Sequence, residues 1–261
     1  MKLVKTKLNG LDFWYREDDR YIGQRIALGK YEKYETALLL SQIDKDSVAV
    51  DAGANIGYYT MLLAQRAKKV YAVEPDEEIF GILKKNVKEN KLKNVVLLNA
   101  AASDKKEKKY LLKDENNYGN SRLSDKKGVL TNCLRLDDIL KDEQYISAIK
   151  VDVQGWEPAV VEGARKIIER DSPTLMLEYT PGEYKDEKMI NFLKKIYQNI
   201  WSINDFAEVP WPIYKGVKIL GKEGYADLWI KKKMSAGDYL TMLKSVNYKK
   251  AIKGIMTRWQ K

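Results

Sequence analysis

The chain has 261 residues, 44% of them hydrophobic and 32% charged, which is a globular composition and enough for one sizeable α/β domain with appendages. One cysteine, Cys133, excludes an internal disulfide and a multi-cysteine zinc cluster, and no apolar run approaches the ~18 residues that indicate a membrane span. The net charge is +10, but nine Lys/Arg and one acid in residues 231–261 hold +8 of it, so the rest of the chain lacks a uniformly basic nucleic-acid-binding face.

Residues 1–44 are expected to form a cap segment in front of the main domain. Their pattern predicts a hairpin followed by a helix over 31–40. The N-terminus lacks the apolar core of a signal peptide, so we expect a cytoplasmic protein.

Residues 45–234 form the predicted main domain, in which short apolar runs alternate with helical patterns, as is typical of βαβ units. Strands are predicted over 47–51, 70–74, 95–98, 146–153 and 174–179, with weaker strands near Ile200 and over 226–230, and helices over 57–67, 75–90, 158–170 and 187–197. Polar residues 101–136 are expected to form a hairpin or long loop with a strand at 110–112. We therefore predict a Rossmann-like α/β fold with a mostly parallel seven-stranded sheet and helices on both faces.

A nucleoside cofactor site is predicted where the first two strands of this sheet end. Asp51 ends the first strand, Gly53 and Gly57 flank the turn that follows, and Glu74 ends the second strand. The glycines let a ligand approach the backbone closely, and Glu74 can accept hydrogen bonds from both ribose hydroxyls. The alternative is that these residues have a structural role alone: Asp51 caps the turn, and the glycines allow the turn to pack closely.

The loop chemistry favours S-adenosylmethionine over a dinucleotide, because Asp51 would repel a pyrophosphate but attract an ammonium and a sulfonium. This disfavours a dehydrogenase. Small residues at Ala101 and Ala102 leave room for adenine, or alternatively serve close packing. The residues expected to bind the cofactor are Asp51, Gly53, Asn55, Gly57, Glu74, Pro75, Ala101, Ala102 and Asp152.

Catalytic side chains are predicted on the fourth and fifth strands. Strand alternation places Lys150, Asp152 and Gln154 on one side, and a buried Lys150 needs a partner such as Asp152 or Glu178. The chain has no histidine, so Asp152 is the expected general base, supported by Lys150 and Glu178. A purely structural ion pair is the alternative.

These motifs resemble the FkbM-type methyltransferase family over roughly 29–231. The matching pieces are 29–36, 50–60, 73–75, 99–104, 136–138, the stretch Lys150-Val-Asp-Val-Gln-Gly-Trp-Glu, 161–164 and 177–179. The resemblance implies a class I methyltransferase fold and O-methylation of hydroxyls, commonly on sugars or polyketide-like products. Gln154 stands where the family often has an acid, so no metal ligands are predicted, although use of a divalent metal is left open.

The acceptor is expected to contact the polar segment 116–122 through Asn117, Asn120 and Arg122, unless this segment is a solvated hairpin tip. We therefore expect an S-adenosylmethionine-dependent O-methyltransferase acting on a small molecule, a sugar, a glycan or a glycolipid. The alternatives are an RNA methyltransferase, for which the charge distribution gives little support, and a non-catalytic scaffold that binds S-adenosylmethionine.

Residues 235–261 form a predicted basic tail of two short helices, since the apolar face switches sides around Asn247. In the second helix, Tyr248 to Lys261, lysines oppose an apolar face. Such a helix can lie peripherally on the anionic inner surface of a membrane, or it can pack on the main domain or on a second subunit in a homodimer. The sequence leaves these alternatives open.

Overall fold

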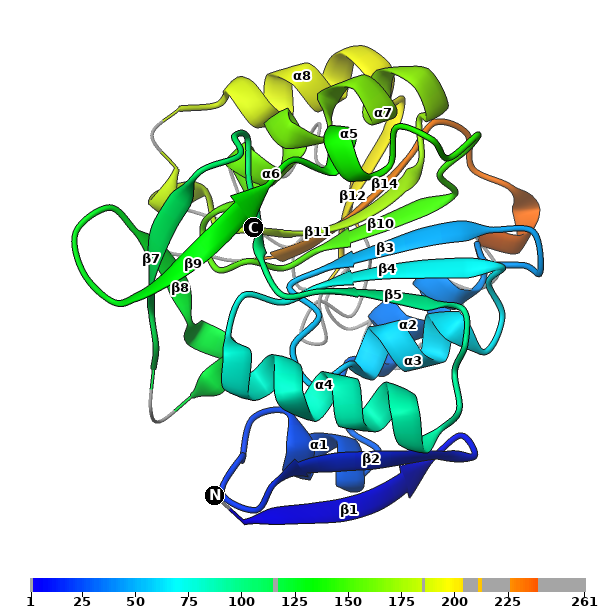
Figure 1. Ribbon diagram of the computed structural model, residues 1–261. Coiled ribbons are helices and arrows are strands. Elements are labelled where there is room, and N and C mark those ends of the chain that lie inside the picture. The colour runs from blue at the N-terminus through cyan, green and yellow to red at the C-terminus, as the bar shows by residue number, and fades with distance from the viewer. Residues whose placement is uncertain (1, 115–116, 185, 204–210, 213–225, 239–261) are drawn as a thin grey trace, which may run out of the picture.

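An eight-stranded mixed sheet forms the centre of the protein, as the computed structural model shows for residues 2–114, 117–184, 186–203, 211–212 and 226–238 (Figure 1). In spatial order the strands are β13 (Trp211–Pro212), β12 (Asn199–Ile203), β14 (Ala226–Lys231), β11 (Thr174–Tyr179), β10 (Ala148–Val151), β3 (Val48–Ala52), β4 (Lys69–Val73) and β5 (Val95–Leu98). Strands β11, β10, β3, β4 and β5 pair in parallel, whereas β14 is antiparallel to both β11 and β12. Apart from the two-residue β13, this is the predicted seven-stranded sheet.

The switch in strand order lies between β3 and β10. From β3 the chain moves outward to β4 and β5, and it later returns to β10 and continues to β11 on the other side. In open α/β sheets, ligands bind beyond the carboxyl ends of the strands at such a point.

Helices cover both faces of the sheet (Figure 1). One face carries α2 (Lys33–Leu40), α3 (Tyr58–Ala64) and α4 (Glu77–Glu89); the other carries α5 (Leu136–Ile139), α6 (Glu157–Gly163), α7 (Arg165–Asp171) and α8 (Lys188–Ile196). Alternate residues of β3 enter different cores: Val48 and Val50 pack toward α6 and α7, while Ala49 packs toward α3. This two-sided burial explains why the central strands read as continuous apolar runs.

The predicted helix over 158–170 is in fact two helices, α6 and α7, with a break at Ala164. The Asp137 carboxylate, from α5, accepts hydrogen bonds from the backbone N–H groups of Lys166 and Ile167 at 3.3 and 3.1 Å. These bonds satisfy free N–H groups at the start of α7 and so stabilise a second helix start. The fourth strand is also shorter than predicted, because β10 ends at Val151.

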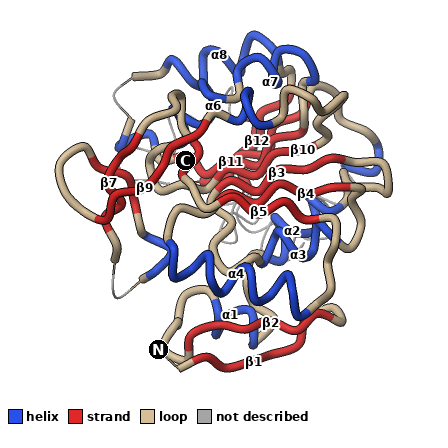
Figure 2. The backbone as a smooth tube through the Cα atoms, in the orientation of Figure 1, coloured by secondary structure: helices blue, strands red, loops and turns tan. Residues whose placement is uncertain are grey.

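Two smaller sheets flank the centre (Figure 2). The cap hairpin pairs β1 (Leu3–Leu8) with β2 (Leu11–Arg16), and a short helix α1 (Gly23–Ala27) that the sequence did not predict follows it. The expected hairpin or loop after β5 is a four-stranded sheet of β6 (Ala101–Ala102), β9 (Val129–Leu134), β7 (Lys108–Leu112) and β8 (Arg122–Ser124).

The cap hairpin is attached to the main domain by Asn86 of α4 and by Asn90, the C-cap residue of that helix. Asn86 accepts a hydrogen bond from the Trp14 N–H and donates one to the Trp14 carbonyl, at 2.6 and 2.9 Å. Asn90 makes the corresponding pair of bonds with the backbone of Asp12. The cap hairpin therefore packs directly on the main domain.

None of the helices within the described ranges is long and apolar enough to cross a membrane. The predicted tail helices, including Tyr248 to Lys261, lie outside those ranges.

Candidate active site

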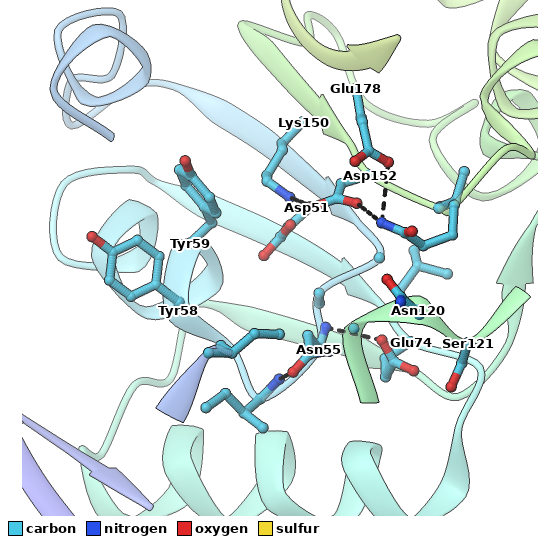
Figure 3. A pocket seen from close by; sticks show the side chains of 18 of the residues that line it. Asp51, Asn55, Tyr58, Tyr59, Glu74, Asn120, Ser121, Lys150, Asp152 and Glu178 are labelled. Atoms are coloured by element: carbon cyan, nitrogen blue, oxygen red, sulfur yellow. Dashed lines mark hydrogen bonds and ion pairs between the residues drawn. The ribbon is translucent and has the colours of Figure 1, made fainter. Parts of the chain in front are cut away.

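A cavity of about 440 Å³ opens at the carboxyl ends of β3, β4, β10 and β11, at the switch point (Figure 3). Twelve predicted site residues line it: Asp51, Gly53, Asn55, Glu74, Pro75, Ala101, Ala102, Asn117, Asn120, Lys150, Asp152 and Glu178. Two predicted residues do not. Gly57 is the N-cap of α3 and packs against Leu83 of α4, and Arg122 is exposed on β8.

Glu74 forms one end of the cavity. Its two carboxylate oxygens accept hydrogen bonds from the backbone N–H groups of Asn55 and Asp76, both at 2.9 Å. The side chain is only 6% exposed, and burial raises its pKa to about 7. Each oxygen retains a further lone pair, so this carboxylate can accept two more hydrogen bonds from a ligand's hydroxyls.

Asp51 supplies a buried acceptor without a partner. One carboxylate oxygen, Oδ2, accepts a hydrogen bond from the Thr60 hydroxyl at 2.6 Å. The other, Oδ1, is buried and has no hydrogen-bond partner among the residues that the structure describes, and the residue is 1% exposed. Because a buried polar atom without a partner costs free energy, this oxygen fits a ligand that donates a hydrogen bond, such as an ammonium group.

The turn after β3 is packed closely against the end of β10. Gly53 has φ +83°, and a Cβ at this position would strike the backbone carbonyl oxygen of Asp152. Only glycine combines this conformation with this contact. The turn after β3 and the segment after β10 that carries Asp152 are therefore held in one fixed arrangement.

Lys150 lies at the other end of the cavity, buried on β10. Its ammonium is 2.9 Å from Asp152 Oδ2 and 4.8 Å from the centre of the Tyr59 ring. Burial alone would lower the pKa of Lys150, but the charges of Asp152, Glu32 and Asp51 raise it, so the lysine stays protonated. The predicted pair of Lys150 with Asp152 is confirmed.

Asp152 and Glu178 are bridged by Gln154. The Gln154 amide donates to Asp152 Oδ1 and to Glu178 Oε2, each at 3.1 Å (Figure 3). Burial opposes ionisation of Asp152, yet the charge of Lys150 and the hydrogen bonds it receives hold its pKa below the ordinary value. Burial and the nearby carboxylate of Asp152 raise the pKa of Glu178 to about 10. These shifts favour the ionised form of Asp152 and the protonated form of Glu178.

Sequence reasoning missed three further acids in this cavity: Glu32, Glu35 and Asp227. Glu32 accepts a hydrogen bond from the Tyr59 hydroxyl at 2.7 Å and has φ +34°. Asp227, on β14, is the register partner of Glu178 on β11. Burial raises the pKa of Glu32 and of Asp227. The sequence held a signal for each of these two residues. Glu32 lies in the family-like motif at 29–36, and Asp227 is an acid inside an otherwise apolar predicted strand.

The acids of the cavity do not form a cation site in the described part of the chain, where no group of three or more His, Cys, Asp or Glu side chains is arranged to hold a metal ion.

The family of this chain follows from comparison with known proteins. The methyltransferase FkbM domain matches residues 51–208, more than half of the chain, so the protein belongs to the FkbM methyltransferase family. The match contains Asp51, Glu74, Asp152 and Glu178, whereas Glu32 and Asp227 lie outside it on opposite sides.

Individual relatives are similar over parts of their length. A protein of Oceanobacillus iheyensis, named as an uncharacterized RNA methyltransferase, is 44% identical over 62 residues, which are 24% of this chain and 14% of that relative. The chain therefore spans a small part of this curated relative. The crystal structure of an FkbM methyltransferase from Methylobacillus flagellatus has 18% identity and a TM-score of 0.47, covering 72% of this chain and 44% of that one. Trm5b from Pyrococcus abyssi has 15% identity and a TM-score of 0.50, covering 88% and 55%. These last two likenesses concern the fold.

Proposed function

We propose that this protein transfers a methyl group from S-adenosylmethionine to a hydroxyl of an uncharged, sugar-like acceptor, such as a glycan or glycolipid. The observation that carries the proposal is the Asp152 carboxyl group, which contacts Lys150 and Gln154 and lies in the same cavity as Asp51 and Glu74. The family membership supports the reaction class, and the cavity chemistry supports the acceptor class.

Asp51 and Glu74 fit different parts of the cofactor. Asp51 Oδ1 needs a hydrogen-bond donor, and the two oxygens of Glu74 can take both hydroxyls of a ribose. Ala101 and Ala102 line the same cavity and leave room for a flat base. When bound, S-adenosylmethionine would supply an electrophilic methyl group.

Asp152 then serves as the base for the acceptor. An alcohol is a weak nucleophile and gains from proton removal as the new C–O bond forms. Asp152 accepts that proton, while Lys150 holds the carboxylate in place and the protein aligns the hydroxyl with the methyl group. The carboxylate is available at neutral pH because its pKa is held low.

The charges of the cavity favour an acceptor without phosphates. Asp152 carries the negative charge that the acceptor would meet, because burial favours the uncharged forms of Glu32, Glu178 and Asp227. Lys150 is already paired with Asp152. A phosphodiester brought next to Asp152 would meet like charge in a partly buried space. We therefore favour a sugar hydroxyl over RNA as acceptor, although a relative is named as an RNA methyltransferase.

The acceptor walls are proposed to come from outside the matched domain. Glu32 and Tyr31 precede residues 51–208, and Asp227 follows them, yet all three line the cavity. Side chains that flank the shared domain can change acceptor preference without disturbing the cofactor site.

Two measurements test the proposal. Calorimetry should detect S-adenosylhomocysteine binding and no comparable binding of NAD or ATP. Labelled S-adenosylmethionine should then deliver label to the glycan and glycolipid fractions of a host extract, but not to its RNA. The matched control is Asp152→Asn, which should bind S-adenosylhomocysteine within a few fold of the parent yet lose about 10²-fold or more in turnover. Label found only in RNA would refute the acceptor class, and absence of S-adenosylhomocysteine binding would refute the cofactor.

A further inference from the structure

Gln154 has a backbone conformation that its residue type does not favour. Its φ is +55°, in the left-handed region, where glycine and asparagine are the usual residues. Gly155 follows with φ +88°, so two consecutive left-handed residues turn the chain out of β10. A strained residue that lines a cavity suggests a functional reason for its side chain.

The strained turn is clamped on both sides of Gln154 by a buried acid. Glu157 Oε1 accepts hydrogen bonds from the backbone N–H groups of Val153 and Gly155, at 3.0 and 3.2 Å. The Tyr184 hydroxyl donates to the second oxygen of Glu157 at 3.0 Å. The backbone at 154 is therefore fixed by its surroundings. The Gln154 side chain does not take part in fixing the turn and points its amide at groups in the cavity.

The chemistry of the bridge requires an amide. The Gln154 nitrogen carries two N–H groups, and both acceptors, on Asp152 and Glu178, are carboxyl oxygens at 3.1 Å. Lys150 donates to the other oxygen of Asp152, so the carboxylate is held at both oxygens. A glutamate at 154 would instead place a third carboxyl group against the other two and could not donate to both.

We propose that Gln154 is a positioning residue, whose side-chain amide fixes the Asp152 carboxylate in the orientation in which it meets the acceptor hydroxyl. This inference rests on the proposed function, in which Asp152 is the base. Gln154 acts through Asp152 and does not itself take part in bond making.

Two variants separate this role from a role in the turn. Gln154→Met keeps the length of the side chain and removes its donors. Gln154→Asn is better suited to φ +55° but is one methylene shorter, so the amide no longer reaches both carboxyls. If Gln154 served only the turn, Gln154→Asn would match the parent or exceed it in stability and in every other property.

The readouts are the pH titration of the Asp152 carboxyl carbon by NMR, the affinity for S-adenosylhomocysteine, and turnover with the acceptor fraction. We expect both variants to raise the pKa of Asp152, because a donor to its ionised form is lost, and to lower kcat by about 10-fold or more with KM for S-adenosylmethionine unchanged. An unshifted titration together with parental turnover in Gln154→Asn would overturn the inference. Failure of the parent to bind S-adenosylhomocysteine would instead overturn the proposed function, so the two failures are distinguishable.

Discussion

Replacement of Lys150 by methionine tests the electrostatic arrangement of the cavity. Lys150 is 6% exposed, and it is the cation that faces Asp152, with Asp51 and Glu32 also close enough to raise its pKa. Methionine is similar in length and removes the charge, its hydrogen bond and its contact with the Tyr59 ring. The substitution therefore leaves the Asp152 carboxylate in a partly buried space without its counter-ion.

The expected cost follows from the burial of the two partners. Breaking a fully buried ion pair by removing one member costs about 3–5 kcal/mol, because the remaining charge is uncompensated. The Asp152 side chain is 28% exposed toward the cavity, where water can solvate it in part. We therefore expect Lys150→Met to lower the free energy of unfolding by about 2–4 kcal/mol at pH 8, below the upper end of that range.

Urea denaturation of four proteins measures this cost: the parent, Lys150→Met, Asp152→Asn and the double variant. The double variant contains no charge at either position, so it should regain at least about 1 kcal/mol relative to Lys150→Met. A matched control, Lys188→Met, removes an exposed lysine and should change the free energy of unfolding by less than about 0.5 kcal/mol.

The pH dependence of the same variant has a definite sign. In the parent, the pKa of Asp152 is lowered, so its contribution is fully present above the ordinary value of 3.8 and is lost as the pH falls through the folded value. Without Lys150, burial dominates and the pKa of Asp152 rises, so protonation relieves the folded state at low pH. The destabilisation should therefore be smaller at pH 5 than at pH 8. Equal destabilisation at both values, with no recovery in the double variant, would refute the reasoning.

Three further outcomes are expected. The affinity for S-adenosylhomocysteine should increase between pH 6 and pH 8, because burial raises the pKa of Glu74 to about 7 and ribose hydroxyls donate to its ionised form. Calorimetry on Glu74→Gln should show an affinity that is weaker by about 1–3 kcal/mol and no longer depends on pH. Gly53→Ala should lower the free energy of unfolding by more than about 1 kcal/mol, since φ is +83° and the Cβ would strike Asp152. Tyr197→Phe should cost about 1–3 kcal/mol in thermal unfolding, because its hydroxyl donates at 2.7 Å to the carbonyl of Pro173, but it should leave the S-adenosylhomocysteine affinity unchanged.

The sequence predicted the central sheet well because its strands are buried on both faces. Strands β5 and β11 agree with the predicted 95–98 and 174–179, and β3 and β4 are each displaced by one residue. The residues at the carboxyl ends of these strands must meet at one edge of the sheet. Asp51, Glu74 and Asp152 could therefore be predicted from the sequence to line one site.

What the sequence did not predict depends on contacts between distant segments. Ser121 and Leu123 line the cavity while Arg122, between them, is exposed, since alternate residues entering β8 face opposite sides. The polarity of segment 116–122 alone could not predict which of its residues face the cavity. The entry of Asp227 into the site likewise depends on the pairing of β14 with β11.

The place of β14 has a consequence for the order in which the cavity is completed. This strand is the last in the described part of the chain, yet it inserts between β11 and β12, which are synthesised before it. Pairing of such distant segments is slow, and it cannot begin on the ribosome until residues 226–231 have emerged. Until then β11 and β12 each expose an unpaired edge, and the cavity lacks the wall that holds Asp227. The part of the cavity built on β3 and β4, with Asp51 and Glu74, can therefore form well before the part that holds Asp227.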